Sequence, residues 1–265
     1  MINNYHTHTN LCDGTSELEE YVDSAIKNGC TEIGFSGHSY APWDKTCLGM
    51  DSEKLQIYKE KIELARQKYR DIKIYRGIEL DYYSEIDTKD FDYIIGAVHY
   101  VKKGEEYIPV DFKVEILVEL VNKLYKGDFN EFVADYYNLL GILHNKTKCG
   151  IIAHIDLITK LNKNERLFSQ SGAIYRSLVL ENLKKLENAP VLYEVNTGGM
   201  ARGYLDSFYP ETFILDYLGQ KGKTFILGAD CHNPDKLLYK LQESKIILQE
   251  KGYNLANDIK SILKR

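Results

Sequence analysis

No apolar run in the 265-residue chain comes near the roughly 18 residues that a membrane-spanning helix requires. The first residues, MINNYHTHTN, contain no apolar core of the kind that defines a signal peptide. The net charge is -5 and no basic stripe is present, which gives no electrostatic reason for binding nucleic acid. We therefore expect neither a membrane nor a nucleic acid as partner.

Cysteine and proline are also scarce. The cysteines are odd in number, lie at scattered spacings and form no CxxC pair, so the sequence indicates neither a zinc ribbon nor a disulfide framework; they are Cys12, Cys30, Cys47, Cys149 and Cys231. A reducing, cytoplasmic location is the simplest interpretation. The few prolines do not cluster, and no repeat, low-complexity tract or flexible linker interrupts the chain. We expect one domain over residues 1–265.

Short apolar runs alternate with longer amphipathic stretches. The runs are rich in Ile, Val, Tyr and Phe, as buried parallel strands are, and cover residues 2–7, 32–36, 72–79, 93–99, 150–154, 191–196 and 224–229. Helical patterns cover residues 16–28, 51–69, 111–126, 129–146, 172–187, 211–219 and 234–251. This alternation predicts an α/β fold with a parallel sheet. Seven strands favour a closed or nearly closed barrel, although an open doubly wound sheet has the same local pattern.

Chemically active side chains gather at the ends of the predicted strands. Six of the seven ends supply a His, Asp or Glu, and together they offer nine candidate ligands: His6, His8, Asp13, His38, Glu79, His99, His154, Asp230 and His232. The carboxyl ends of barrel strands form the active face. We therefore expect all nine to converge on one mouth.

The residue types fit a metal cluster. His6 and His8 are two residues apart on a predicted strand, so both rings project from the same face. Imidazole and carboxylate together suit Zn, Fe or Mn. Nine ligands are too many for one ion and suit three if a carboxylate bridges, for which Glu79 is the natural candidate. Ordinary core histidines are the alternative, but burying so many ionisable groups without metal costs on the order of several kcal/mol each.

Charge arithmetic indicates the ligand of such a cluster. Three divalent ions would bring six positive charges and Asp13, Glu79 and Asp230 would return three, which leaves the site near +3. A phosphate dianion is the common metabolite group that suits this charge, and clustered metals bind phosphoryl oxygens and activate water. The pattern therefore predicts a phosphomonoesterase whose partner is a small phosphate monoester.

The predicted strand 191–196 supplies no metal ligand, yet its end reads EVNTGGMARGY. Glu194, Asn196 and Arg202 are polar there, and Arg202 can hold phosphate through two hydrogen bonds. A surface position in the loop is the alternative for Arg202. We expect Arg202 and Asn196, with Lys160 as a weaker candidate, to contact substrate. Aromatic residues after strand ends could line a pocket: Tyr40, Trp43, Tyr100 and Tyr204.

Cysteines near these motifs are not expected to react. Cys231 lies between two candidate ligands, but on an extended segment it should point away from them. Cys12 and Cys47 could approach the mouth, and nothing in the sequence activates either as a nucleophile.

The same segments resemble the PHP (polymerase and histidinol phosphatase) family over essentially the whole chain. HTHTNLCDG, GFSGHS, IIAHID and GADCH match its four motifs, and GIELDYYS and GAVHYV match the segments between them. The fourth motif usually has Ala where Cys231 stands, which is not a ligand position. The full-length match, the segment EVNTGGMARGYLDSFYP and the long insertion after residue 99 resemble the monofunctional branch that hydrolyses L-histidinol phosphate in histidine biosynthesis.

This resemblance implies a distorted seven-stranded (β/α)7 TIM-like barrel with three divalent metals. One metal would be held by His6, His8, Glu79 and Asp230, a second by Glu79, His99 and His154, and a third by Asp13, His38 and His232. It further implies that a metal-bridging hydroxide attacks phosphorus while Arg202 steadies the phosphate. Asp13 and His232 are candidates for protonating the leaving alkoxide, and binding of the alkoxide by a metal is the alternative.

Other functions remain open at this point. A phosphodiesterase or exonuclease of the same family, or a phosphatase for another small phosphorylated metabolite, could have a similar site. An amidohydrolase barrel also begins with HxH, but it typically has eight strands and often a modified lysine as bridge. A non-catalytic metal-binding module has no need of Arg202 beside an open metal face. The identity of the metals and the oligomeric state are not readable from the sequence.

Overall fold

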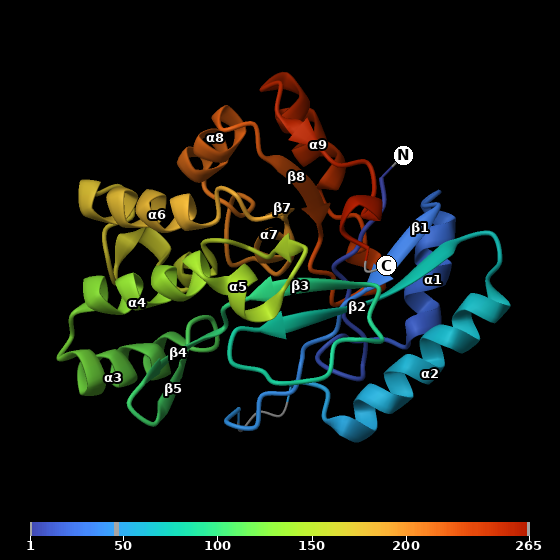
Figure 1. Cartoon of the computed structure of the whole chain (residues 1–265), viewed down its shortest axis with the longest axis horizontal. Coiled ribbons are helices and arrows are strands. Elements are labelled where there is room, and N and C mark those ends of the chain that lie inside the picture. The colour runs from blue at the N-terminus through green and yellow to red at the C-terminus, as the bar shows by residue number, and fades with distance from the viewer. Residues whose placement is uncertain (1, 45–47, 264–265) are drawn as a thin grey trace.

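A computed structural model describes residues 2–44 and 48–263. Within them, one parallel sheet has the strand order β1-β2-β3-β6-β7-β8-β9 (Figure 1). Its strands are β1 (Glu32–Phe35), β2 (Lys73–Asp81), β3 (Tyr93–Ala97), β6 (Ile151–Ile152), β7 (Leu192–Asn196), β8 (Thr224–Gly228) and β9 (Asn254–Leu255). The predicted α/β class with a parallel sheet is confirmed, because every neighbouring pair in this sheet is parallel.

Helices surround the central strands on several sides in Figure 1. They are α1 (Leu18–Lys27), α2 (Ser52–Lys68), α3 (Val114–Tyr125), α4 (Phe129–Gly141), α5 (Leu143–Thr147), α6 (Ala173–Lys185), α7 (Gly198–Ala201), α8 (Thr212–Gln220) and α9 (Leu241–Glu250). Short 3-10 turns are η1 (Leu157–Thr159), η2 (Lys163–Glu165), η3 (Pro234–Lys236) and η4 (Lys260–Ile262). Among the described residues, no helix has the length and apolar character needed to cross a membrane.

Side-chain caps and left-handed residues set several helix ends. Asp51 and Asp128 precede α2 and α4, and each carboxylate accepts hydrogen bonds from backbone N–H groups of the first turn. The predicted helix 129–146 divides at Ile142 into α4 and α5. The predicted helix 234–251 begins as a helix only at Leu241, because Lys240 adopts a left-handed conformation with φ 52°.

The predicted first strand, residues 2–7, is wrong as a regular strand. The segment forms only isolated parallel bridges, Asn4 with Ile33 and Thr7 with Cys231. Some backbone N–H groups in this region donate to side chains and not to a neighbouring strand. Asn4 Oδ1 accepts from the amides of His6 and Ala229, and Ser36 Oγ accepts from Thr7 N.

This N-terminal segment nevertheless joins the two ends of the curled sheet. Backbone hydrogen bonds connect it to β1 on one side, where Ser36 N donates to Thr7 O at 2.9 Å. On the other side, His8 N donates to Cys231 O at 2.8 Å, beyond the end of β8. The seventh regular strand is instead β9, two residues that pair with the start of β8. The result is the expected distorted seven-stranded barrel, with an irregular segment where a strand was predicted.

A hairpin after β3 was not predicted as strands. Its strands β4 (Tyr100–Lys103) and β5 (Glu106–Pro109) are antiparallel and form a separate two-stranded sheet. Val101 and Ile108 face each other and are buried, which anchors the hairpin to the core below α3 and α4. It therefore stands beside the carboxyl ends of the strands.

A small apolar layer fills the inside of the barrel under the carboxyl ends of the strands. Alternate residues of β3, Tyr93, Ile95 and Ala97, belong to it, while Ile94 belongs to the larger core under the helices. The Tyr93 hydroxyl donates to Tyr5 O at 2.5 Å, which ties the N-terminal segment to the layer. The next residues of that segment, His6 to His8, are thereby held directly above a packed floor.

Candidate metal centre

All nine predicted ligands lie at the carboxyl end of the barrel. His6 and His8 come from the N-terminal segment, Glu79 from inside β2, and the others from the loops after this segment, β1, β3, β6 and β8. Within the described residues, their donor atoms form four overlapping groups: His8, Asp13, His38 and His232; His6, His8 and Asp230; His6, Glu79 and His154; and His38, Glu79 and His99. The structure thus brings together residues from His6 near the start of the chain to His232 near its end.

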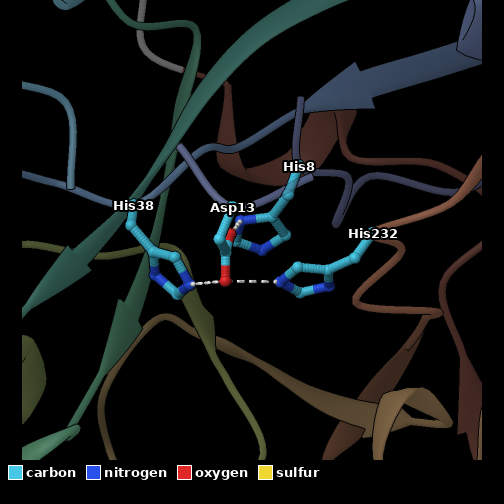
Figure 2. Close-up of side chains that lie close together, drawn as sticks. All are labelled: His8, Asp13, His38 and His232. Atoms are coloured by element: carbon cyan, nitrogen blue, oxygen red, sulfur yellow. Dashed lines mark hydrogen bonds and ion pairs between the residues drawn. The ribbon is translucent and has the colours of Figure 1, made fainter. Parts of the chain in front are cut away.

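The group nearest the opening is centred on Asp13. Its Oδ2 lies 3.1 Å from His232 Nε2 and 3.5 Å from His38 Nε2, and its Oδ1 lies 3.3 Å from His8 Nδ1. Figure 2 shows the carboxylate between the rings of His38 and His232, with His8 beside it. The rings of His8 and His232 are stacked with centroids 4.1 Å apart.

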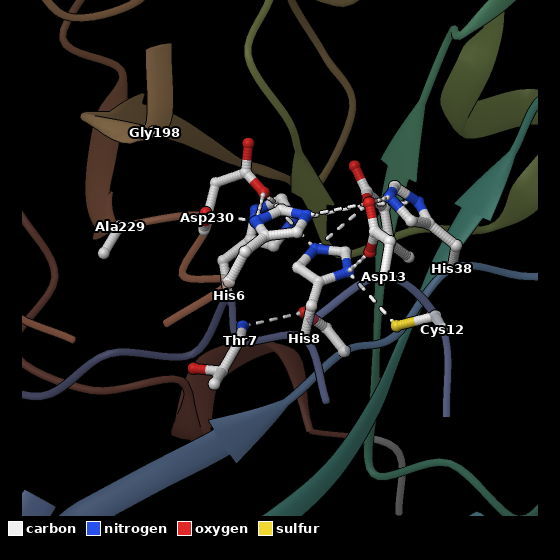
Figure 3. Close-up of polar contacts among 12 residues, drawn as sticks. His6, Thr7, His8, Cys12, Asp13, His38, Gly198, Ala229 and Asp230 are labelled. Carbon is white, nitrogen blue, oxygen red and sulfur yellow. Dashed lines mark hydrogen bonds and ion pairs between the residues drawn. The ribbon is translucent and has the colours of Figure 1, made fainter. Parts of the chain in front are cut away.

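The inner group consists of His6, His8, Glu79 and Asp230. Glu79 Oε2 lies 3.4 Å from His6 Nε2 and 3.5 Å from His8 Nε2. Asp230 Oδ1 lies 3.7 Å and 3.3 Å from the same two nitrogens. Figure 3 shows these histidine rings and the Asp230 carboxylate pointing toward one another. Ligand atoms in a tetrahedral shell about 2.1 Å from an ion lie about 3.4 Å apart, and these four nitrogen–oxygen distances are close to that spacing.

Glu79 connects the groups through its two oxygens. Oε1 lies 2.9 Å from His154 Nε2 and 3.4 Å from His99 Nε2. Oε2 lies 2.9 Å from His38 Nδ1 and also faces the inner group. The groups therefore overlap more than the family pattern implies, since His38 approaches both Asp13 and Glu79 and His8 belongs to two groups.

Unpartnered buried atoms test whether a cation fits this cluster. Among the nine candidate ligands, four atoms are buried without a hydrogen-bond partner: His6 Nε2, His8 Nε2, Asp13 Oδ1 and Glu79 Oε2. A buried polar atom without a partner costs about 1–3 kcal/mol, and all four belong to the groups just described. Imidazole nitrogens and carboxylate oxygens are the donors that Zn, Fe and Mn accept, so the residues fit divalent ions.

Opposite charges outweigh burial at Glu79, His6 and Asp13, whereas burial lowers the pKa of His232. Burial alone would raise the pKa of Glu79, but the positive charges of His38 and His6 hold it well below its usual range. Burial alone would lower the pKa of His6, but neighbouring carboxylates, Glu194 first among them, raise it to about 10. Burial opposes ionisation of Asp13 too, yet His38 keeps its pKa far below normal. The carboxylates stay ionised beside cations, and a bound metal would replace the histidine protons.

Two buried carboxylates support the cluster without belonging to it. Glu194 Oε1 lies 2.7 Å from His6 Nδ1, and Asp81 Oδ2 accepts from His99 N at 2.9 Å. The sequence pattern puts Glu194 at a strand end without indicating a role, and the pattern of strand-end ligands does not include Asp81. Asp81 could have been found from its two-residue spacing to Glu79, which puts both side chains on one face of β2.

The three predicted substrate-binding residues lie at different depths. Arg202 Nη2 donates to Asp230 Oδ2 at 2.7 Å and Nη1 lies 2.7 Å from His232 Nδ1, so its guanidinium adjoins the cluster. Lys160 Nζ donates to Asp111 Oδ2 at 2.8 Å. Asn196 lies deeper and is fully buried. Its amide is bonded to Glu194 and to a backbone N–H, which makes it part of the support under the cluster.

A cavity of about 760 Å³ opens over the cluster. Its lining includes the ligands Asp13, His38, Glu79 and His99 together with Lys160. The prediction that Trp43, Tyr100 and Tyr204 line a pocket is confirmed, whereas Tyr40 is 40% exposed and does not line this cavity. Another cavity, of about 850 Å³, lies at the opposite ends of the strands around Arg66, Arg70 and Lys73, and none of the nine ligands lines it.

Of the cysteines near the motifs, Cys231 agrees with the expectation for it and Cys12 does so only in part. Cys231 Sγ donates to Asn233 O at 3.0 Å and is buried away from the cavity lining. Cys12 Sγ lies 3.5 Å from His8 Nδ1, so it does approach the cluster. Contrary to the expectation that nothing activates this thiol, the contact with His8 lowers the pKa of Cys12 although burial opposes it. Cys47 lies outside the described residues.

Comparison with known families agrees with the motifs. The family model of the PHP domain matches residues 4–198, which contain seven of the nine candidate ligands. The chain belongs to the PHP domain family. Within this family, a histidinol-phosphatase of Bacillus subtilis is 26% identical over 260 residues, covering 88% of this chain and 94% of that protein. A histidinol-phosphatase of Lactococcus lactis is 25% identical over 265 residues, covering 94% of this chain and 91% of that protein.

Solved structures show the same PHP fold. A candidate histidinol phosphatase from Listeria monocytogenes has a TM-score of 0.77 at 20% identity and covers 91% of this chain and 99% of its own. The histidinol phosphate phosphatase of Lactococcus lactis, complexed with Zn, L-histidinol and phosphate, has a TM-score of 0.74 at 19% identity. It covers 100% of this chain and 99% of its own.

Proposed function

We propose that the chain is a metal-dependent phosphomonoesterase that hydrolyses L-histidinol phosphate to L-histidinol and phosphate, a step of histidine biosynthesis. The observation that carries the proposal is the convergence of nine imidazole and carboxylate ligands in four overlapping groups, four of them lining a cavity. Full-length similarity to two histidinol-phosphatases supports the same reaction. The Lactococcus lactis structure with Zn, L-histidinol and phosphate supports the choice of substrate.

Three divalent ions suit the number and overlap of the ligands. His6, His8, Glu79 and Asp230 would hold one, Glu79, His99 and His154 a second, and Asp13, His38 and His232 a third. When bound, such ions neutralise phosphoryl charge and lower the pKa of coordinated water to near neutrality. The donor set accepts Zn, Fe or Mn, and the presence of Zn in the Lactococcus lactis structure makes Zn the first ion to test.

Two cationic side chains are placed to bind the phosphate. Arg202 presents a planar guanidinium beside Asp230 and is 27% exposed, so part of it remains accessible. Its Nε is buried without a partner, which leaves a donor for an anion. Lys160 lines the cavity and is held by Asp111, from the segment that follows the hairpin. Asp13 also lines the cavity and lies 3.1 Å from His232, and the ion that this pair would hold with His38 would stabilise the leaving oxygen.

The rest of the cavity suits the leaving group. L-histidinol carries an amine and an imidazole, and acidic side chains of Asp44, Glu105 and Glu106 line the cavity. Trp43 stacks on Tyr107 with ring centroids 4.3 Å apart, which makes a flat aromatic wall. A cationic amino alcohol with an aromatic ring is complementary to these groups in charge and shape.

Steady-state kinetics on the zinc-loaded or manganese-loaded protein would test the proposal. The substrates are L-histidinol phosphate, other small phosphomonoesters, p-nitrophenyl phosphate and its bis ester. We expect the highest kcat/KM for L-histidinol phosphate and little turnover of the diester. Faster hydrolysis of another monoester would reassign the substrate, and preference for the diester would favour the nuclease branch of the family.

A further inference from the structure

Glu194 is buried beside the metal centre but belongs to none of its four ligand groups. Its Oε1 lies 2.7 Å from His6 Nδ1. Its Oε2 accepts from His154 N at 3.1 Å and from Asn196 Nδ2 at 2.9 Å. One carboxylate from β7 thus contacts two segments that each carry a ligand, the N-terminal segment and the loop after β6.

The direction of these hydrogen bonds is fixed by the backbone. Gly198 N donates to Asn196 Oδ1 at 2.8 Å, so the amide nitrogen of Asn196 must face Glu194. An ionised carboxylate only accepts hydrogen bonds. It follows that His6 Nδ1 carries the hydrogen that lies between His6 and Glu194.

The opposite nitrogen of His6 is then left for the metal. His6 Nε2 is buried and has no hydrogen-bond partner. It lies 3.4 Å from Glu79 Oε2 and 3.7 Å from Asp230 Oδ1, in the inner group of donors. With a hydrogen on Nδ1, Nε2 faces these oxygens and is the nitrogen at which a metal would replace a proton.

Close packing keeps the Glu194 carboxylate in this position. A Cβ atom on Gly228 would lie 1.9 Å from Glu194 Oε1, so β8 must have glycine where it passes the carboxylate. The neighbouring strand thereby leaves room for Glu194 and closes the space behind it.

We propose that Glu194 is a positioning residue of the metal centre, which holds His6 in the tautomer whose Nε2 lone pair faces Glu79 and Asp230. This inference rests on the metal site of the proposed function. Glu194 acts through His6 and touches no substrate. A carboxylate that orients a metal-binding histidine and strengthens its donor nitrogen is typically worth about 10–100-fold in metal affinity.

Glu194→Gln changes the hydrogen bonding with almost no change in shape. If its amide oxygen faces His6, its NH2 group meets two donors, the N–H of His154 and the amide of Asn196. If the NH2 group faces His6, the ring must move its hydrogen to Nε2, where it blocks the metal. We expect the metal-stripped variant to bind Zn²⁺ about 10–100-fold more weakly than the unchanged protein, measured by chelator competition at fixed pH.

Two further variants separate positioning from a general effect on the fold. Glu32→Gln is the matched control, because Glu32 also accepts a hydrogen bond from the N-terminal segment, from Tyr5, but at the opposite end of the barrel. It should bind Zn²⁺ as the unchanged protein does. Glu194→Asp keeps the charge, so it should recover part of the zinc affinity. It should also fold if Glu194→Gln does not.

The outcomes distinguish this inference from the proposed function. The role of Glu194 is overturned if folded Glu194→Gln binds zinc within about twofold of the unchanged protein. If that variant does not fold, the same result for Glu194→Asp overturns it. In zinc-loaded protein, ¹⁵N NMR should show His6 protonated at Nδ1, and a hydrogen on Nε2 would also overturn it. An unchanged protein that binds no zinc would instead overturn the proposed function.

Discussion

Glu79 is the residue on which the geometry of the metal centre depends most. Its two oxygens lie within 3.5 Å of five histidines, and its side chain is completely buried. A carboxylate in this position can be shared between ions, which no imidazole can be. Its role could be predicted from the sequence because Glu79 ends a predicted strand. The role of Glu194 could not, because its partner His6 lies 188 residues away.

Removal of a central ligand should abolish turnover without unfolding the protein. Glu79→Ala and His8→Ala each remove donors from two groups, so we expect kcat/KM to fall by at least about 100-fold, since bound metals contribute several kcal/mol to the transition state. Far-UV circular dichroism should stay near that of the unchanged protein. Glu85→Ala, at an exposed carboxylate on the surface, is the control. Normal turnover in either ligand variant would contradict the assignment.

Catalysis should need the paired hydrogen-bond donors of the Arg202 guanidinium and not only its positive charge. Arg202→Ala should lower kcat/KM for L-histidinol phosphate by about 100-fold or more, because a donor to the transferring phosphoryl group is lost. Arg202→Lys should recover only part of this, since an ammonium cannot form the same paired hydrogen bonds. Arg176→Ala, at an exposed arginine of α6, should change little. Equal activity of Arg202→Lys and the unchanged protein would rule out the bidentate contact.

At the scale of elements, the regular parts of the fold were predictable and the irregular parts were not. The runs that became β1, β2, β3, β6, β7 and β8 are apolar and flanked by turn residues, so local pattern identifies them. Residues 2–7 have the same pattern, but backbone amides there donate hydrogen bonds to the side chains of Asn4 and Ser36 in place of a ladder. Those partners lie in distant parts of the chain, which local pattern cannot reveal. The β4–β5 hairpin lies in a stretch that was treated as an insertion.

The hairpin should determine which leaving group is accepted. Tyr107 on β5 stacks on Trp43 and lines the cavity. Tyr107→Ala should raise KM for L-histidinol phosphate by about 2–12-fold, the worth of an aromatic contact. The inhibition constant of inorganic phosphate should not change, because phosphate has no ring to stack. A parallel rise in both constants would show that the hairpin affects the metal centre rather than the leaving group.

At the scale of the whole molecule, the metal centre and the barrel depend on each other. The nine ligands come from the N-terminal segment and its loop, the region from β1 to β3, and the ends of β6 and β8. Bound ions would therefore hold together the two ends of the curled sheet where an irregular segment closes it. That the chain is one domain stays a prediction, and the barrel closure by residues 4–8 agrees with it.

Metal binding should raise the thermal stability of the protein. At 100-fold excess over Kd, one ion adds about 2.7 kcal/mol to the free energy of unfolding. For a chain of this size we expect Tm to rise by about 5–10 °C with Zn²⁺ or Mn²⁺ and to return after chelation. His8→Ala should show a smaller rise by calorimetry. An unchanged Tm would indicate that the ions bind outside the barrel or not at all.

Anomalous X-ray diffraction from crystals grown with zinc or manganese would test the metal centre most directly. We predict three anomalous peaks at the carboxyl end of the barrel, with Glu79 between two of them and His6, His154 and Asp230 among the ligands. Peaks elsewhere on the molecule, or a cluster of these side chains that binds no ion at saturating metal, would contradict the account.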